Sequence, residues 1–459
     1  MMNRTLLQSL AGFVDQLTFD ELPPHVIKKA NDAWFDLVGC YYGALRIDET
    51  NSRLLQYAYN NSPNQQVTLW GTGLKASVDQ AAMAEGFIGY YLEFDDGVSL
   101  GGHWASSSIP AIIANVEREH GNGTDVIQSL VCAYEVGTRI SRLYASTLLM
   151  NKVHFPCTMG AFAASAGVAK ARKLDKSTIA EGFSNGCLSP VGPYSTAISG
   201  AQIKNMYSGW PNYLGIKMMD FAELGIGGDI DIFESENGLG KIFAGKNLDE
   251  TVMLESIASL GSHYHLMDSY CKPYPCCRWL HAPIRLMESI LSENKAHQID
   301  QIAVYGPLFL QLYAASDGFS QKVKAQYSIP YSIAALICNG QLGIHEYDEA
   351  IRNNADVKKM AKRIRIIPDT ELDTLFPSQF IVRVAVNFSD GTVVTKEGGL
   401  PWGPDSPATQ DELIDKFSRL VEGTISSEER DRWISMYRSG LETEGAFSEM
   451  LSLFSIPHI

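Results

Sequence analysis

The spacing of apolar residues changes twice along this chain of 459 residues, and the change limits the folds that the chain can adopt. Over residues 1–265, apolar positions recur at helical spacing, and small residues crowd stretches such as 159–171. Amphipathic helices that carry small residues can pack closely against one another. The pattern therefore predicts a tight bundle of helices over this part of the chain.

Strand-like alternation begins in the next part, residues 266–400. Residues 299–305 and 363–367 alternate apolar and polar side chains, and an Asp-Gly pair at 390–391 separates two further runs at 379–388 and 392–396. An Asp-Gly pair between two such runs is a strong signal for a β-hairpin. We expect a mixed α+β unit here, followed by helices over 401–459 that cross back to the helical part.

Charge and composition exclude several classes of protein. Lys and Arg number 37 against 52 Asp and Glu, and the formal charge of −15 argues against nucleic acid as the main partner. The longest uncharged stretch, residues 182–203, is too polar to span a membrane, and the N-terminus lacks a signal-peptide pattern. Eight cysteines without disulfide-like spacing are typical of reduced thiols, so we expect a cytoplasmic protein without a membrane partner.

Two histidines each precede a predicted helix. His103 stands before a helix that opens with Trp104, and His154 stands before the small-residue helix. The N-terminus of a helix carries unpaired N–H groups and a partial positive charge, so two such ends that converge would favour an anionic ligand. The alternative interpretation is that both histidines are polar residues of turns.

Charged residues near these histidines also have two interpretations. Glu93, Asp95 and Asp96 lie just upstream of His103 in a stretch otherwise poor in charge. Carboxylates this close can raise one another's pKa or orient an imidazole, or they can be solvated acids of a loop. Lys204, which ends the uncharged stretch, is either a surface lysine or a buried cation that meets an anion.

The segment 270–281 is dense in reactive side chains and includes Lys272 and Arg278. Its potential metal ligands are Cys271, Cys276, Cys277 and His281. They lack the paired spacing of a structural zinc site, so we expect no metal there. The glycines at 225–228 follow no predicted strand and are a weak dinucleotide signal.

Taken in order, these segments resemble the MmgE/PrpD family along almost the whole chain, and the block 272–281 is the most specific part of the match. The matching segments are 32–43, 94–96 with His103, 134–136, 154–156, Lys204, 236–240, 272–281 and 327–331. The resemblance implies a mainly α fold. An all-helical domain would form from both chain ends, 1–265 and 401–459, with an α+β lid domain, 266–400, inserted between them.

The resemblance also implies a site between the two domains, without metal or organic cofactor, in a homodimer. The implied catalytic residues are His103, His154, Lys204, Lys272 and Tyr313. The candidate substrate-binding residues are Glu93, Asp95, Asp96, Tyr207 and Arg278. The partner expected at this site is a small anionic carboxylate.

Roles for these residues follow from the substrates of the family, which are small polycarboxylates. The implied reactions build charge next to a carboxylate, where Lys204 and Lys272 would supply fixed positive charge. We expect His103 to move the proton at the reacting carbon, with one of the three acids orienting it. His154 and Tyr313 would serve the leaving group or the final protonation.

Four positions depart from the cis-aconitate decarboxylases of the family. Glu93 stands where those proteins have aspartate, Gly97 where they have threonine, Trp104 where proline is usual, and Tyr207 where histidine is usual. These changes would alter the shape of the pocket and leave the proton-transferring residues in place. The preferred substrate therefore stays open.

We expect a cofactor-free lyase that acts on a small di- or tricarboxylate, similar to 2-methylcitrate dehydratase or cis-aconitate decarboxylase. The first alternative is an epimerase of a related dicarboxylate such as iminodisuccinate, which would use the same proton abstraction. The second alternative is a catalytically silent protein that binds a carboxylate.

Overall fold

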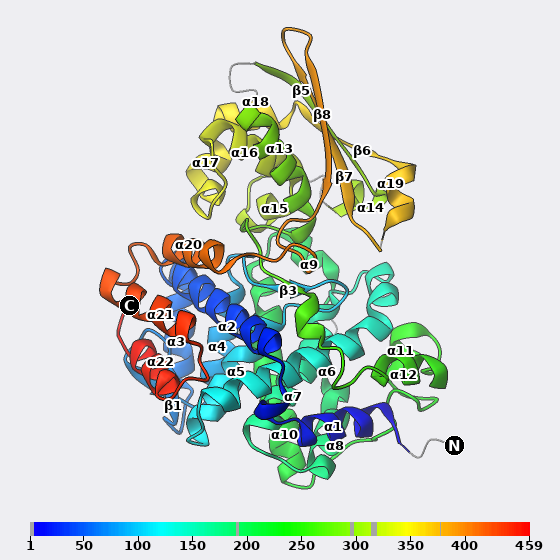
Figure 1. Cartoon of the computed structure of the whole chain (residues 1–459), viewed down its shortest axis with the longest axis vertical. Helices are drawn as coiled ribbons and strands as arrows, with labels where there is room; N and C mark the ends of the chain where they lie inside the picture. The colour runs from blue at the N-terminus through cyan, green and yellow to red at the C-terminus, as the bar shows by residue number, and fades with distance from the viewer. Residues whose placement is uncertain (1–3, 190–191, 294–297, 314–318, 377) are drawn as a thin grey trace.

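The computed structural model describes residues 4–189, 192–293, 298–313, 319–376 and 378–459. Figure 1 shows a larger helical part below and a smaller part with an upright sheet above. We call them the helical part and the sheet part.

The helical part contains most of the N-terminal half of the chain and the C-terminal helices. Its helices are α1 (Leu6–Gln16), α2 (Pro24–Leu45), α3 (Glu49–Asn60), α4 (Val78–Tyr90), α5 (Trp104–Arg118), α6 (Gly123–Met150), α7 (Phe155–Ala171), α8 (Lys176–Ser184), α9 (Tyr194–Ser199), α10 (Met206–Glu223), α11 (Leu239–Ala244), α12 (Glu250–Ile257), α20 (Gln410–Val421), α21 (Ser427–Ser439) and α22 (Ala446–Phe454). Its strands are β1 (Val67–Leu69), β2 (Leu74–Ala76), β3 (Gly97–Val98) and β4 (Ser269–Tyr270).

The small-residue helix α7 lies at the centre of the helical part. It packs against α5, α6, α8 and α10, and its alanines are fully buried. The close approach depends on glycines of the neighbouring helices: a Cβ atom at Gly215 of α10 would press against the backbone of Ser165. The tight packing predicted from the small residues is therefore confirmed.

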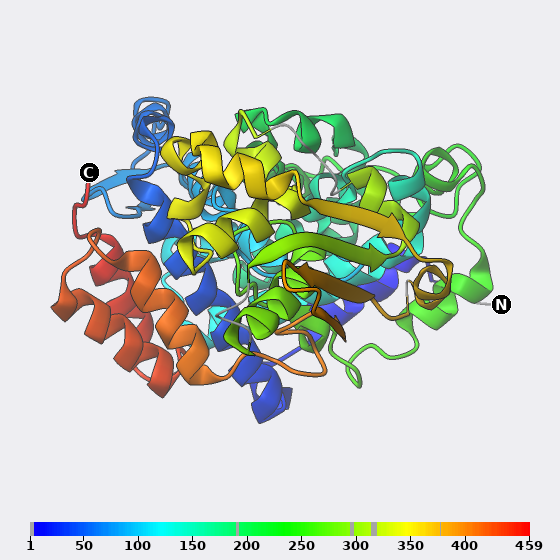
Figure 2. The same cartoon turned by 90° about the horizontal axis from the view of Figure 1, so that it is seen from above.

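The C-terminal helices pack against α2, on one side of the helical part (Figure 2). The ring of Phe35 on α2 lies flat between Tyr437, at 4.0 Å between ring centroids, and Phe417, at 4.4 Å. Trp34 meets Tyr437 edge to face. Stacked and edge-to-face aromatic contacts of this kind add about 0.5–1.5 kcal/mol each to the apolar burial. The two ends of the chain thus share one hydrophobic core.

The sheet part has a separate hydrophobic core. Its helices are α13 (His281–Glu293), α14 (Leu308–Tyr313), α15 (Lys322–Gln326), α16 (Ile329–Asn339), α17 (Glu349–Asn353), α18 (Ala355–Ala361) and α19 (Thr370–Leu375). Its strands are β5 (Ile299–Gly306), β6 (Ile364–Pro368), β7 (Ile381–Phe388) and β8 (Val393–Gly399).

The four strands form one mixed sheet in the order β6-β5-β7-β8. The β5–β6 pair is parallel, and the other two pairs are antiparallel. Alternate residues of β7, among them Val382, Val384 and Val386, are buried, which is the period of a strand with one covered face. Helix α13 packs against β7 and β8. Gly391 in the predicted hairpin turn has a φ of +88°, a conformation that favours glycine.

The mainly α fold with a small sheet domain is confirmed, with one correction. The helical part is not all-helical, because β1 pairs with β2 and β3 pairs with β4. These strands are two or three residues long, too short to show a period-2 pattern in the sequence. The division at 265/266 and 400/401 stays a proposal, which the two separate cores support.

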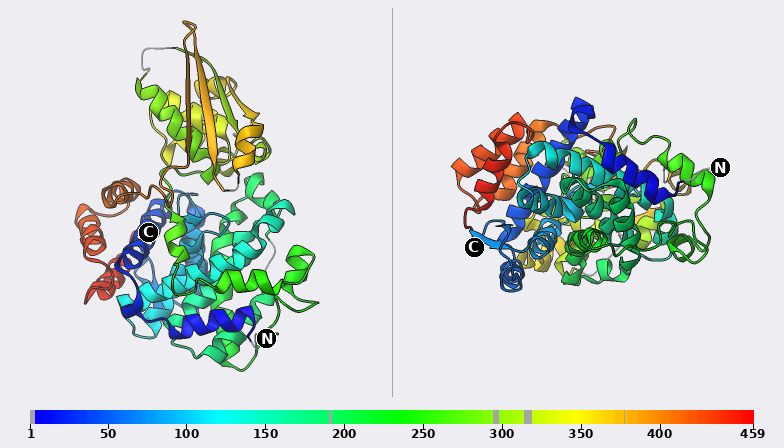
Figure 3. Two further views of the ribbon diagram at one scale, coloured as in Figure 1. Left: turned by 45° about the vertical axis from the view of Figure 1, so that its right-hand side comes forward. Right: turned by 90° about the horizontal axis from the view of Figure 1, so that it is seen from below.

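The two parts meet where the chain leaves the helical part (Figure 3, left). Strand β4, which precedes Lys272, pairs with β3 through Gly97 and Tyr270. This pairing holds the start of the crossing segment 270–281 against the loop that follows α4. Within the described ranges, no helix is long and apolar enough to cross a membrane.

We predict that Gly123→Ala destabilises the protein by about 1–3 kcal/mol, because overpacking of a filled interior costs energy of this size. A Cβ atom at Gly123, the first residue of α6, would overlap the carbonyl oxygen of Leu441 in the C-terminal segment. Gly12→Ala in α1 is the control, since its Cβ would meet only Lys176 side-chain atoms, the nearest at 3.5 Å. Thermal unfolding of both variants measures the difference. Equal melting temperatures would contradict the packing of the C-terminal return against α6.

Candidate active site

Residues 92–96, which we call the acid loop, connect α4 to β3 and carry three buried carboxyl groups. Glu93, Asp95 and Asp96 are at most 3% exposed. A charged carboxylate is costly to bury unless it is paired or hydrogen-bonded. The interpretation of these residues as solvated acids of a loop is therefore wrong.

Glu93 bridges two buried lysines. Its Oε1 atom lies 3.1 Å from Lys272 Nζ, and its Oε2 atom accepts a hydrogen bond from Lys204 Nζ. Lys272 Nζ also donates to the Glu93 carbonyl oxygen at 3.1 Å. Lys204 Nζ lies 3.9 Å above the centre of the Tyr90 ring, a second favourable site for a cation. Lys204 is thus a buried cation that meets an anion, and the surface interpretation is wrong.

Two opposed effects act on the Lys204 ammonium. Burial and the neighbouring charge of Lys272 lower its pKa, whereas the carboxylate of Glu93 favours the charged form. Lys272 is held by both the carboxylate and the carbonyl of Glu93. A second carboxylate that enters this group would find ammonium donors that are already oriented.

His103 is the N-cap residue of α5, and its tautomer is fixed by one contact. Its Nδ1 atom lies 2.6 Å from the carbonyl oxygen of Asp96. Because a carbonyl oxygen only accepts, Nδ1 carries the proton and Nε2 keeps a free lone pair. Burial and the charge of Lys272 lower the pKa of the imidazole to about 3. His103 is therefore neutral near pH 7, with Nε2 unprotonated.

Asp95 and Asp96 each accept a hydrogen bond from a hydroxyl group of a neighbouring helix. Ser106 donates to Asp95 Oδ2 at 2.6 Å, and Tyr134 on α6 donates to Asp96 Oδ2. Burial raises the pKa of Asp95 to about 6 and that of Asp96 to about 7. Asp95 Oδ2 also lies 3.6 Å from His103 Nδ1. The protonated side of the imidazole thus faces the Asp95 carboxyl group and the backbone carbonyl of Asp96.

His154 and Tyr207 form a neighbouring pair. His154 is the N-cap residue of α7, its ring centroid lies 4.8 Å from that of Tyr207, and its Nδ1 atom has no hydrogen-bond partner among the described residues. Burial and the positive charge that His103 would carry lower the pKa of His154 to about 3. His154 is thus buried and the His103 side chain is only 14% exposed, so neither is an exposed turn residue.

Arg278 and Tyr313 were also candidates. Arg278 is buried, lies 4.1 Å from the Tyr270 ring and approaches His281 Nδ1 at 3.4 Å. None of its hydrogen bonds or ion pairs in the described part of the chain reaches Glu93 or the two lysines. Its contacts support the crossing segment. Tyr313 ends α14, and its side chain lies outside the described residues.

Several site residues were not predicted as such. Ser106 and Tyr134 hold the two aspartates, and Lys416 and Gln326 contact the acid loop from distant parts of the chain. Tyr134 lies in one of the segments that match the family, so a signal existed for it. Lys416 is one charged residue of an amphipathic helix, and no local pattern distinguishes it.

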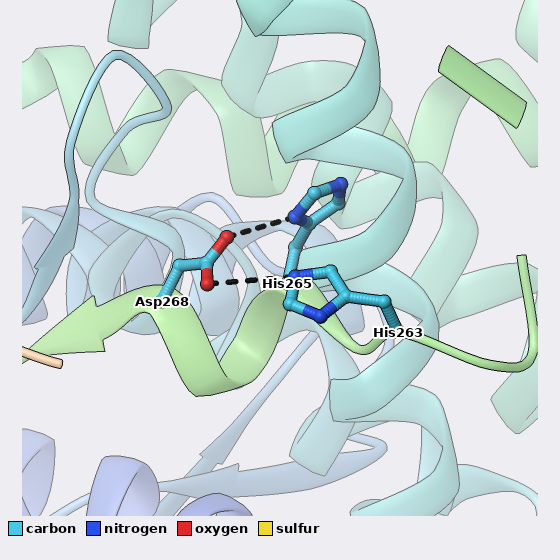
Figure 4. A group of neighbouring side chains, drawn as sticks. All are labelled: His263, His265 and Asp268. Atoms are coloured by element: carbon cyan, nitrogen blue, oxygen red, sulfur yellow. Dashed lines mark hydrogen bonds and ion pairs between the residues drawn. The ribbon is translucent and has the colours of Figure 1, made fainter. Parts of the chain in front are cut away.

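One group of three potential metal ligands occurs among the described residues, and it lies away from the cysteines. His263, His265 and Asp268 place their ligand atoms within 4.8 Å of one another (Figure 4). The Arg142 guanidinium, however, donates to Asp268 Oδ2 at 2.9 Å and lies 3.1 Å from His265 Nδ1. These contacts already place the Arg142 cation against two of the three ligand atoms. The group is therefore better described as a cluster of ion pairs than as a metal site.

Comparison with known proteins identifies the family. Residues 8–251 match the MmgE/PrpD N-terminal domain, and residues 274–439 match the MmgE/PrpD C-terminal domain. Cis-aconitate decarboxylase of Aspergillus terreus is 25% identical over 98% of this chain and 95% of the relative. The mouse protein of that name is 21% identical over 91% of this chain and 87% of its own, and the human protein is 21% identical over 91% and 88%. This chain belongs to the MmgE/PrpD family.

Proposed function

We propose that this protein is a lyase that acts on a small di- or tricarboxylate by proton transfer at a carbon next to a carboxylate. One observation carries the proposal: two buried lysines meet on the carboxylate of Glu93, and Lys272 also lies 4.0 Å from Asp95. Asp95 in turn lies 3.6 Å from His103, whose tautomer the Asp96 carbonyl oxygen fixes. The names of the relatives, cis-aconitate decarboxylases, support a lyase. At about 25% identity they do not decide the substrate.

The lysines would bind a carboxylate of the substrate. Lys272 and Lys204 already hold the Glu93 carboxylate, so a substrate carboxylate that enters beside or in place of it would use the same donors. Charge-assisted hydrogen bonds in a site without water are worth more than in solution. The same ammonium groups would stabilise the negative charge that develops next to the carboxylate during the reaction.

His103 would act as the base. Its free Nε2 atom takes the proton from the reacting carbon, while Asp96 holds Nδ1 through its carbonyl oxygen. In a dehydration, the electron pair of the broken C–H bond forms the double bond, and the hydroxyl group leaves as water after it is protonated. In a decarboxylation, the C–C bond breaks instead, and the carbanion left behind takes up a proton. His154 and Tyr313 would supply these protons.

A bound polyanion would change His154 in the direction that this role requires. In the free protein the pKa of His154 is lowered to about 3, so the ring is neutral near pH 7. A substrate with two or three carboxylates would raise the pKa, because an opposite charge nearby favours the protonated imidazole.

The predicted cofactor independence, homodimer and cytoplasmic location belong to the same proposal, and light scattering of the purified protein would test the dimer.

The experiment is a substrate panel of citrate, 2-methylcitrate, cis-aconitate and iminodisuccinate in deuterated buffer, followed by mass and ultraviolet absorbance. Loss of the mass of water or of CO₂ would establish dehydration or decarboxylation. Deuterium in recovered substrate, without a lighter product, would favour the epimerase. If one acid raises the melting temperature and none is converted, the carboxylate-binding alternative replaces the lyase.

His103→Asn should lower kcat by about 100- to 10,000-fold, the usual contribution of a general base. The asparagine amide can still donate to the Asp96 carbonyl oxygen, so the local fold is retained while the basic nitrogen is lost. His120→Asn is the control, because His120 is exposed just beyond the other end of α5. Steady-state kinetics on the converted acid measure the effect. Full activity of His103→Asn would place the base elsewhere.

Asp96→Asn should gain stability relative to the wild type as the pH rises from about 4 to about 7, on top of any constant effect of the amide on the bonds from Tyr134 and Ala105. Burial raises the pKa of Asp96 to about 7, far above its value in the unfolded chain. Between these two pKa values, Asp96 keeps a proton in the folded state that it releases in the unfolded state. Its contribution to the free energy of unfolding is present in full at low pH and is lost as the pH rises through 7. Asparagine does not titrate and escapes this loss, which amounts to at most about 1.4 kcal/mol per pH unit.

Denaturant unfolding of both proteins at pH 5 and pH 8 measures this difference. The gain from Asp96→Asn should be larger at pH 8. A gain that is equal at both values, or larger at pH 5, would contradict a raised pKa for Asp96.

A further inference from the structure

Three successive carbonyl groups of the acid loop accept hydrogen bonds from three distant segments of the chain. The Leu92 oxygen accepts from Gln326 Nε2 at 2.8 Å, the Glu93 oxygen from Lys272 Nζ at 3.1 Å, and the Phe94 oxygen from Lys416 Nζ at 2.7 Å. Gln326 belongs to the sheet part, Lys272 to the crossing segment and Lys416 to the C-terminal return.

The backbone at Glu93 requires such support. Its φ is +55°, in the left-handed region that costs a residue with a side chain about 1–2 kcal/mol. Conformations of this kind persist where the surroundings hold them in place, and they are frequent at functional sites. In this conformation Glu93 presents both its carboxylate and its carbonyl oxygen to Lys272.

Lys416 belongs to a buried ion pair. Its Nζ atom lies 2.7 Å from Asp36 on α2, and both side chains are 2% exposed. The cost of removing two charges from water often equals the attraction between them, so apolar residues of similar size would serve stability as well. Only the ammonium group, however, can pair with Asp36 and also donate to the Phe94 carbonyl oxygen.

Phe94 is buried in the hydrophobic core and also borders a cavity. A cavity of about 1360 Å³ opens there, and its lining includes Phe94, Lys416, Pro273, Gly340, Trp402 and Arg419. The Lys416 ammonium also lies 4.1 Å from the centre of the Phe94 ring. Beside this cavity, the two contacts of Lys416, with the carbonyl oxygen and with the ring of Phe94, hold this residue from the side of α20.

We infer that Lys416 is a positioning residue for the active site. It holds the peptide that follows Glu93, so that the Glu93 carboxylate stays on Lys204 and Lys272 and the Asp96 carbonyl stays on His103. The inference rests on the proposed function for its kinetic consequence. Its structural consequence, a rigid acid loop, can be measured without any substrate.

The test is the double variant K416M/D36N, which removes the donor and leaves no unpaired buried charge. Hydrogen–deuterium exchange of the peptide that covers residues 90–98 should become at least 10-fold faster. On the acid that the wild type converts, kcat should fall by about 10- to 100-fold, as expected for a small misplacement of reacting groups, while KM changes less than threefold. K217M/D79N is the control, since it removes another interhelical ion pair, of 2.7 Å, on α10 and at the start of α4.

D36N alone distinguishes positioning from simple ion pairing. Without its counter-charge the buried lysine can give up a proton, but the neutral amine still donates to the Phe94 carbonyl oxygen, so exchange and kcat should stay within threefold of the wild type. Loss of activity equal to that of the double variant would overturn the inference, as would an unchanged exchange rate in K416M/D36N. If the double variant does not fold, K416M/D36L replaces it: an apolar pair takes the place of the ion pair, the donor to the Phe94 carbonyl oxygen is lost, and unchanged exchange again contradicts the inference. If no acid is converted, the proposed function fails and the exchange measurement still decides.

Discussion

The contact between Glu93 and the two buried lysines sets the conditions for the rest of the site. Lys272 and Lys204 are 0% and 2% exposed, and without a counter-charge their burial would be prohibitive. Glu93 supplies that charge, from a backbone conformation that few residues with side chains adopt. The protein therefore holds two ammonium groups in its interior against one carboxylate, at the cost of local backbone strain.

Glu93, Lys204 and Lys272 come together from segments that are far apart in the sequence. The acid loop follows α4, Lys204 precedes α10, and Lys272 lies where the chain crosses into the sheet part. The pairing of β3 with β4 brings the crossing segment to the acid loop, and α5 and α6 hold the two aspartates from behind. The positions of the acid loop and of Lys272 thus depend on contacts with the helical core.

Local patterns predicted the elements well, because helix periodicity, strand alternation and turn residues act over short distances. The helices that start after His103 and His154 and the Asp-Gly hairpin follow from such patterns. Most of the candidate residues came from a resemblance to a family. The sequence did not predict which residues pair with one another. Glu93 meets both lysines, and Lys416 contacts Phe94 from 322 residues away, and both contacts depend on tertiary packing. A run of three acids has the same appearance in a solvated loop and in a core.

Binding of the converted acid tests most directly whether the lysines hold the substrate. Calorimetry would measure the affinity for this acid in the non-reacting variant His103→Asn, with and without the further change Lys272→Met. Lys217→Met in the same background is the control for the loss of a lysine elsewhere. Loss of a charge-assisted hydrogen bond should weaken binding by about 10-fold or more. Equal affinity with and without Lys272 would contradict a carboxylate site at the Glu93 bridge.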